Sequence, residues 1–115
     1  MSSEPLRGLS ERHRKAILSF LARVRERLRD VEVYLTGSLA RGDWLLDSDV
    51  DLVVVSDELA GLQPWERYAF LRRLAPPDVP FDIMAYTRAE FERLLALRKA
   101  LVNPEPLLRL SLIHI

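Results

Sequence analysis

Two aspartates one residue apart, Asp49 and Asp51, open an apolar run that continues to Val55. The β-branched residues of this run favour a β-strand, in which alternate side chains point to the same face. The two carboxylates would then share a face, with their Cα atoms about 6.6 Å apart. Two like charges about 5 Å apart repel by roughly 3 kcal/mol at an effective dielectric constant near 20. We therefore expect a cation beside this pair, and carboxylate oxygens favour a hard divalent ion.

A glycine-serine turn, Gly37-Ser38, lies upstream of the aspartates and ends the alternating segment Val31–Leu35, which predicts a first strand. Glycine can adopt a backbone shape that brings the main chain close to a bound group. The free N–H groups of a turn that opens a helix attract anions. We expect Ser38 to cap a short helix and to be able to hydrogen-bond phosphate oxygens. The sequence thus predicts a phosphate site next to a metal site.

Arg41 follows this turn. Its planar, permanently charged guanidinium could pair with a triphosphate. A structural ion pair with Asp43 or Asp47 is the alternative, and the sequence leaves both open.

An Asp-x-Asp pair alone is typical of a solvated strand start, and a Gly-Ser pair alone is typical of a turn. In this chain they occur together, as Gly37-Ser38-x-Ala40-Arg41-Gly42 and then Ser48-Asp49-x-Asp51. The combination resembles the polymerase-beta-like nucleotidyltransferase superfamily over about residues 31–86. The short chain is similar to its minimal nucleotidyltransferase branch, the MNT antitoxin type.

The resemblance implies a Mg²⁺-dependent enzyme that uses ATP as substrate. It places a third carboxylate at Asp82, the one charged residue of the strand-like segment Phe81–Tyr86. Without the resemblance, a lone acid there would be interpreted as a solvated residue. The implied catalytic and metal-binding residues are Asp49, Asp51 and Asp82, and the implied triphosphate-binding residues are Gly37, Ser38 and Arg41.

The rest of the chain predicts three more helices around these strands, which makes four with the short helix at Ser38. Ser10 would cap a helix that runs to about residue 29, with Ile17 and Leu21 on its buried stripe. Pro64 would open another, and Thr87 with Glu90 forms a capping box for a helix continuing through Leu101. We predict an α/β (α+β) fold, a small mixed sheet of three to four strands flanked by helices, as one nucleotidyltransferase domain over residues 1–109.

For several side chains we predict only whether they are buried or exposed. We expect His13 to be exposed among the charges of the first helix, whose basic face is either solvated or a contact for RNA or an acidic partner. We expect Trp65 and Tyr68 to pack in the core rather than to stack on a base. The bulky segment Trp44-Leu45-Leu46 should pack beneath the site, with an exposed contact patch as the alternative.

Composition excludes several classes of protein. The 115 residues contain no cysteine, so disulfides and thiolate chemistry are excluded. No apolar run approaches the ~20 residues that span a bilayer, so we expect a cytoplasmic protein without membrane contact. The 17 basic and 17 acidic residues balance, so we do not expect nucleic acid as a direct ligand.

The last six residues, 110–115, equal the in-frame translation of a transposon adapter end used in sequencing libraries. We interpret them as an adapter scar, and His114 is therefore no site candidate. A genuine apolar C-terminal strand or docking segment is the alternative.

The acceptor of the nucleotide is set by the resemblance alone. Minimal nucleotidyltransferases often act beside a HEPN-type helical RNase, as antitoxins that move AMP from ATP to a tyrosine of the toxin. The first alternative is a small-molecule acceptor such as an aminoglycoside-type antibiotic. The second is a non-catalytic antitoxin that acts by binding. The three carboxylates argue against a decayed site.

Overall fold

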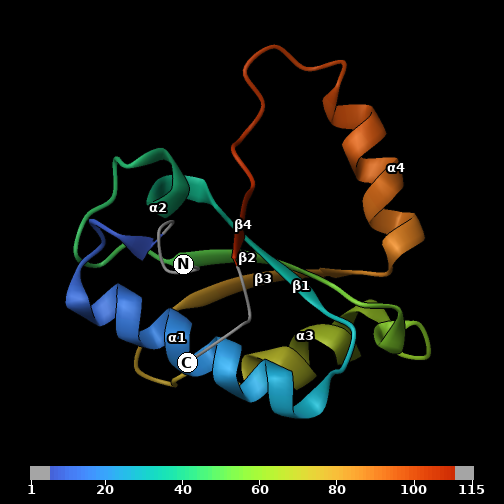
Figure 1. The fold of residues 1–115 in the computed structure, drawn as a ribbon, viewed down its shortest axis with the longest axis horizontal. Helices are drawn as coiled ribbons and strands as arrows, with labels where there is room; N and C mark the ends of the chain where they lie inside the picture. Colours follow the sequence, from blue (N-terminus) through green and yellow to red (C-terminus); the bar gives the residue numbers. More distant parts are fainter. Residues whose placement is uncertain (1–5, 111–115) are drawn as a thin grey trace.

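The computed structural model describes residues 6–110, which form four α-helices, one short 3₁₀-helix and four strands (Figure 1). The helices are α1 (Glu11–Arg27), α2 (Gly37–Arg41), α3 (Pro64–Arg72) and α4 (Arg88–Arg98), and the 3₁₀-helix is Asp57–Leu59. The strands are β1 (Glu32–Thr36), β2 (Val50–Val55), β3 (Phe81–Tyr86) and β4 (Leu108–Leu110). The predicted α/β (α+β) class is confirmed.

The strands form one mixed sheet in the order β3-β2-β1-β4. β2 and β3 are parallel, whereas β1 is antiparallel to both β2 and β4. The register pairs Asp51 of β2 with Thr36 on one side and with Asp82 on the other. The aspartates of two strands far apart in the sequence therefore become neighbours.

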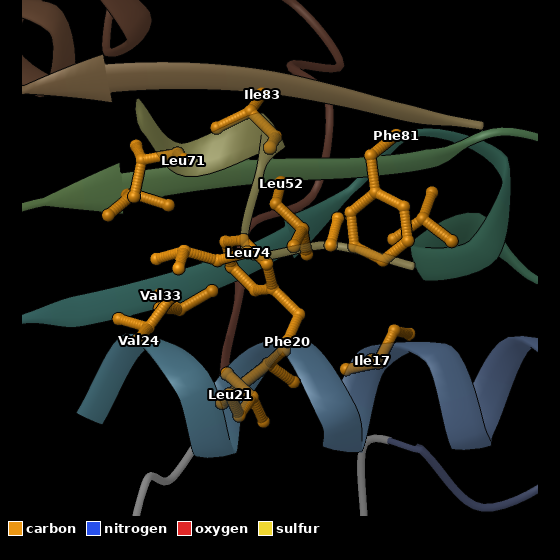
Figure 2. Close-up of a cluster of buried hydrophobic side chains, with 14 of the residues drawn as sticks. Ile17, Phe20, Leu21, Val24, Val33, Leu52, Leu71, Leu74, Phe81 and Ile83 are labelled. Carbon is orange, nitrogen blue, oxygen red and sulfur yellow. The ribbon is translucent and has the colours of Figure 1, made fainter. Parts of the chain in front are cut away.

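One face of the sheet carries the main hydrophobic core, which α1 and α3 cover (Figures 1 and 2). The core side chains labelled in Figure 2 come from both helices, from the turn that follows α3 and from three strands: Ile17, Phe20, Leu21, Val24, Val33, Leu52, Leu71, Leu74, Phe81 and Ile83. The predicted stripe of the first helix is confirmed, because Ile17, Leu21, Val24 and Leu28 are buried. This layer fixes the sheet on which the charged residues sit.

The opposite face is covered only in part. Phe91 of α4 packs on Val53 and Val55 of β2, with Tyr34 and Tyr86 beside them. α4 then stands away from the sheet, and the chain returns from it to β4 through an extended segment (Figure 1). The space between this segment and the sheet remains open.

The starts of α1, α3 and α4 follow the sequence predictions. Ser10 Oγ accepts the backbone N–H of His13 at 3.1 Å, and Thr87 and Glu90 form the reciprocal capping box of α4. Pro64 is the first residue of α3. α4 ends at Arg98, so the prediction that it continues through Leu101 is wrong. Leu101 instead lies in the segment that returns to β4.

The expectation that His13 is exposed is wrong, since the side chain is completely buried. His13 precedes Ile17 by one helical turn and therefore lies on the buried stripe of α1. The charged neighbours that suggested exposure lie on other faces of the helix.

The prediction that Trp65 and Tyr68 lie in the core is also wrong, because they are 70% and 42% exposed. The buried face of α3 instead carries Arg67 and Leu71. Arg67 donates hydrogen bonds to the carbonyls of Leu59 and Ala85 and pairs with Glu90, which explains how a cation can occupy this face.

The bulky segment before β2 divides into two parts. Trp44 packs against the core as predicted, but Leu45 and Leu46 are 70% and 69% exposed. The packing prediction is therefore wrong for these two leucines. A short turn from Leu45 to Ser48 points the two leucines outward. In this turn the N–H of Ser48 donates to the carbonyl of Leu45, and the N–H of Leu45 donates to Ser48 Oγ.

The C-terminal end of the described chain reaches the sheet, where Leu110 pairs with Val33 of β1. Residues 111–115, including His114, lie outside the described range. The adapter interpretation of residues 110–115 and the domain boundary at residue 109 stay predictions, and sequencing the gene from intact genomic DNA tests both. Within residues 6–110, none of the helices has the length and apolar character needed to cross a membrane.

Candidate active site

An open pocket of about 620 Å³ lies on the partly covered face of the sheet. Its walls come from the β1–α2 turn, the starts of β2 and β3, α4, and the segment that returns to β4. The pocket is lined by all six residues that the sequence singled out, namely Gly37, Ser38, Arg41, Asp49, Asp51 and Asp82.

The three carboxylates reach the pocket from two neighbouring strands. Asp51 is the second residue of β2, Asp82 is the second residue of β3, and the two are in register. Paired residues on neighbouring strands lie roughly 4.8 Å apart. Asp49 directly precedes β2. Asp49 and Asp82 are exposed, whereas Asp51 is partly buried. The carboxylate of Asp82 is therefore open to solvent although its neighbours in the sequence are apolar.

The partial burial of Asp51 has an electrostatic consequence. Desolvation raises the pKa of its carboxyl group above the ordinary value of 3.8, and the negative charges of Asp82 and Asp49 raise it further. Arg41 opposes this shift, and Glu105 adds to it. The structure therefore contains the like-charge repulsion that the Asp-x-Asp spacing predicts, and it extends that repulsion to Asp82.

The donor set suits a hard divalent cation, because three carboxylates in one pocket offer only oxygen ligands and excess negative charge. As they stand, however, the three do not converge on one point. Within residues 6–110, no three His, Cys, Asp or Glu side chains are grouped so that they could hold a metal ion together. The structure thus brings the carboxylates into one pocket without assembling a complete ligand cage.

Gly37 lies against Asp51 more closely than any other residue type would allow. Its φ angle is +71°, and a Cβ atom at this position would lie 2.0 Å from Asp51 Oδ2. Glycine is therefore needed twice here, for its backbone conformation and for the space beside the carboxylate.

Ser38 differs from its prediction, because the N-cap of α2 is Thr36. Ser38 lies in the first turn of the helix, so the prediction that it caps the helix is wrong. The chain enters α2 two residues earlier than expected, since the cap is Thr36 rather than Ser38 and Gly37 is the first residue of the helix.

Arg41 is engaged by two carboxylates. Its Nε donates to Asp43 Oδ2 at 3.1 Å, one of the structural pairings left open by the sequence. Its Nη1 lies 2.7 and 2.8 Å from the two carboxylate oxygens of Glu105. Arg98 Nη1 and Nη2 hold the backbone carbonyl of Glu105 at 2.8 and 2.6 Å.

Sequence reasoning missed Glu105 and Arg98, which both line the pocket. No local pattern marks Glu105, which stands between two prolines. The apolar wall was also missed, although strand alternation could have found part of it: Val53 and Met84 follow Asp51 and Asp82 by two residues and therefore share their face. Leu94, Leu101 and Leu107 complete this wall.

We predict that Gly37→Ala lowers the free energy of unfolding by more than about 2 kcal/mol, because a left-handed backbone and an overpacked contact both oppose it. Gly42→Ala is the matched control, since Gly42 has a φ of +91° and nothing within 4 Å of an added Cβ. Urea unfolding measures both. In an Asp51→Ala background the difference between the two substitutions should shrink, because only the Cβ atom of residue 51 remains, at 3.0 Å from the added Cβ. An unchanged difference there would contradict the contact.

We predict that Asp51→Asn raises the melting temperature at pH 7 without divalent ions, by a few degrees for a gain below about 1 kcal/mol. A carboxyl group with a raised folded-state pKa destabilises the fold above that pKa, and this penalty disappears below the unfolded value. The gain should therefore vanish near pH 3. Asp47→Asn, at an exposed position, is the control. A gain that does not depend on pH would contradict the electrostatic cause.

The family model of the nucleotidyltransferase domain matches residues 17–108. A candidate nucleotidyltransferase from Sulfolobus solfataricus superimposes with a TM-score of 0.59 and 24% identity, over 81% of this chain and 76% of that one. A second candidate nucleotidyltransferase has a TM-score of 0.52 and 24% identity, over 84% of this chain and 97% of the other.

At this level of identity the two solved structures share the fold and carry no further assignment. The comparison with curated proteins gave no match. The family model takes in the Gly-Ser turn, all three aspartates and the start of β4, and most of the chain with them. This protein belongs to the nucleotidyltransferase domain family.

Proposed function

We propose that this nucleotidyltransferase moves AMP from ATP to a hydroxyl group in a Mg²⁺-dependent reaction. The observation that carries the proposal is the shared pocket of Asp49, Asp51 and Asp82 with Gly37 and Ser38. Carboxylates for a cation and backbone N–H groups for an anion are the two halves that a metal-bound triphosphate requires.

In this proposal Asp49, Asp51 and Asp82 hold Mg²⁺, which when bound neutralises charge on the reacting phosphate and lowers the pKa of the acceptor hydroxyl. Gly37 and Ser38 bind the β- and γ-phosphates through backbone N–H groups and the serine hydroxyl. Arg41 adds a positive charge on the same side of the pocket. The protein mainly positions the reactants and balances their charges.

The acceptor oxygen forms a bond to the α-phosphorus, and the bond from that phosphorus to the bridging oxygen of the β-phosphate breaks. Pyrophosphate leaves with the electron pair. The proton of the acceptor hydroxyl passes to the carboxylate of Asp82, whose exposed position gives a second substrate access to it. This exposure is the reason to assign Asp82, rather than Asp51, to the acceptor side.

We propose a tyrosine of a HEPN-type helical partner as the acceptor. An open, apolar wall beside the acids supports an aromatic hydroxyl, because Met84 and Leu101 line the pocket while 45% and 60% exposed. A flat ring can pack on such a surface and present its hydroxyl to Asp82. A small-molecule hydroxyl and a non-catalytic antitoxin are the competing outcomes of the test below.

To test this, purified protein is incubated with Mg²⁺ and ATP labelled at the α-phosphate. The incubation is done with and without the protein encoded by the gene next to this one, as the source of the partner. We expect label on a tyrosine of that partner, and Asp51→Asn should reduce it to below about 1% because ATP loses its metal contact. Asp47→Asn should retain activity. Label on a small molecule would favour an antibiotic-type acceptor. No label on any acceptor would contradict the proposed enzyme activity and favour a non-catalytic antitoxin.

The contact between Arg41 and Glu105 predicts opposite effects on ATP affinity. Arg41→Gln should weaken ATP binding about ten-fold by removing a charge-assisted contact. Glu105→Gln should tighten binding several-fold, because the carboxylate no longer competes with the triphosphate for Arg41.

Titration calorimetry with Mg²⁺ and ATP measures both affinities. Asp43→Asn is the control, since Asp43 contacts the Nε side of Arg41 and does not line the pocket. If Glu105→Gln weakened binding as much as Arg41→Gln, Glu105 would orient the arginine rather than compete for it.

A further inference from the structure

His13 is the one histidine among residues 6–110, and its buried ring connects the core helix α1 to the loop that leads into β2. Nδ1 lies 2.9 Å from Ser10 Oγ, and Nε2 lies 3.0 Å from the backbone carbonyl oxygen of Ser48. The ring also meets Trp44 of the same loop edge to face, with centroids 5.6 Å apart.

These contacts require a proton on Nε2 of the ring. A carbonyl oxygen only accepts hydrogen bonds, so Nε2 carries the proton and donates it to Ser48. Ser10 Oγ accepts the backbone N–H of His13 and can therefore donate its own proton to Nδ1. Both ring nitrogens therefore have a hydrogen-bond partner, as a fully buried polar side chain requires.

The N–H, the hydroxyl and the carbonyl of Ser48 each form a hydrogen bond. Its N–H donates to the carbonyl of Leu45, its Oγ accepts from the N–H of Leu45, and its carbonyl accepts from His13. Arg12, the neighbour of His13, donates to the carbonyl of Leu46 in the same loop. The peptide group that joins Ser48 to Asp49 is thus fixed to the most buried helix of the protein.

We propose that His13 is a positioning residue of the active site, which places Asp49 and Asp51 by holding the Ser48 carbonyl. This inference rests on the proposed function, because it concerns the carboxylates assigned there to Mg²⁺. A residue that served packing alone would be apolar at this position, as Ile17, Phe20 and Val24 are on the same stripe. The imidazole instead donates a hydrogen bond to the carbonyl of Ser48, the residue that precedes Asp49.

Three variants separate this role from packing. His13→Phe keeps an aromatic ring against Trp44 and removes the donor. His13→Gln restores an N–H donor at about the distance of Nε2. Ser10→Ala removes the cap of α1 and the Nδ1 partner, but leaves the Ser48 contact, so it controls for lost stability.

Two readouts are taken on each variant: amide hydrogen exchange of residues 45–51 in the metal-free protein, and Mn²⁺ affinity by electron paramagnetic resonance. We expect His13→Phe to accelerate exchange and to weaken Mn²⁺ binding about five-fold, the factor that corresponds to one neutral hydrogen bond. His13→Gln should return both values close to wild type. Ser10→Ala should lower the melting temperature with neither readout changed.

Unchanged exchange and affinity in His13→Phe would overturn the proposal, as would equal losses in His13→Phe and Ser10→Ala. Failure of the nucleotidyl transfer alone would leave both readouts as expected. Absence of the proposed metal site gives a different result, since the wild-type protein would then bind no Mn²⁺ at all. In that case a faster exchange in His13→Phe would confine His13 to a structural role and would also contradict the proposal.

Discussion

The parallel pairing of β2 with β3 is the constraint on which the site depends. It sets Asp51 and Asp82 side by side on the open face of the sheet, where their charges repel and where burial already disfavours the ionised form of Asp51. A register shift of one residue would turn the second carboxylate into the core. The apolar side chains on the other face, Leu52 and Ile83 among them, prevent that shift because they are buried against α1 and α3.

The surroundings of the acids reduce this repulsion only in part. Arg41 is a positive charge that acts on Asp51, and it is shared with Glu105 and Asp43. Gly37 adds no side chain between its backbone and the Asp51 carboxylate. Part of the like-charge repulsion among the acids therefore remains, and in the proposed function a bound cation would relieve it. Groups whose pKa is shifted by burial and by like charges are typical of functional sites.

Much of this arrangement could be predicted from local sequence patterns. The alternation in Val31–Leu35, the β-branched run after Asp49 and the apolar segment Phe81–Tyr86 identified three of the strands, and the caps at Ser10 and Thr87 identified two helix starts. The placement of His13 could also have been predicted, because the helical period joins it to Ile17. Its charged neighbours in the sequence obscured that signal.

Other features depend on tertiary contacts that no short pattern contains. Glu105 reaches Arg41 across 64 residues, through a segment whose course is set by α4 and β4. Trp65 and Tyr68 are exposed because Arg67 finds three backbone carbonyls and Glu90 on the inner side of α3, which hydrophobicity alone would not suggest. The site thus combines a predictable set of carboxylates with partners that only the fold brings to them.

The proposed function requires that the three aspartates and the Gly-Ser turn bind one metal-bound nucleotide. A crystal structure with Mn²⁺ and a non-transferable ATP analogue tests it most directly, because anomalous scattering locates the ion independently of the model. We expect an anomalous peak for Mn²⁺ between Asp49, Asp51 and Asp82, with the triphosphate bound at Gly37 and Ser38. An anomalous peak away from these carboxylates, or a nucleotide bound outside the pocket, would contradict it.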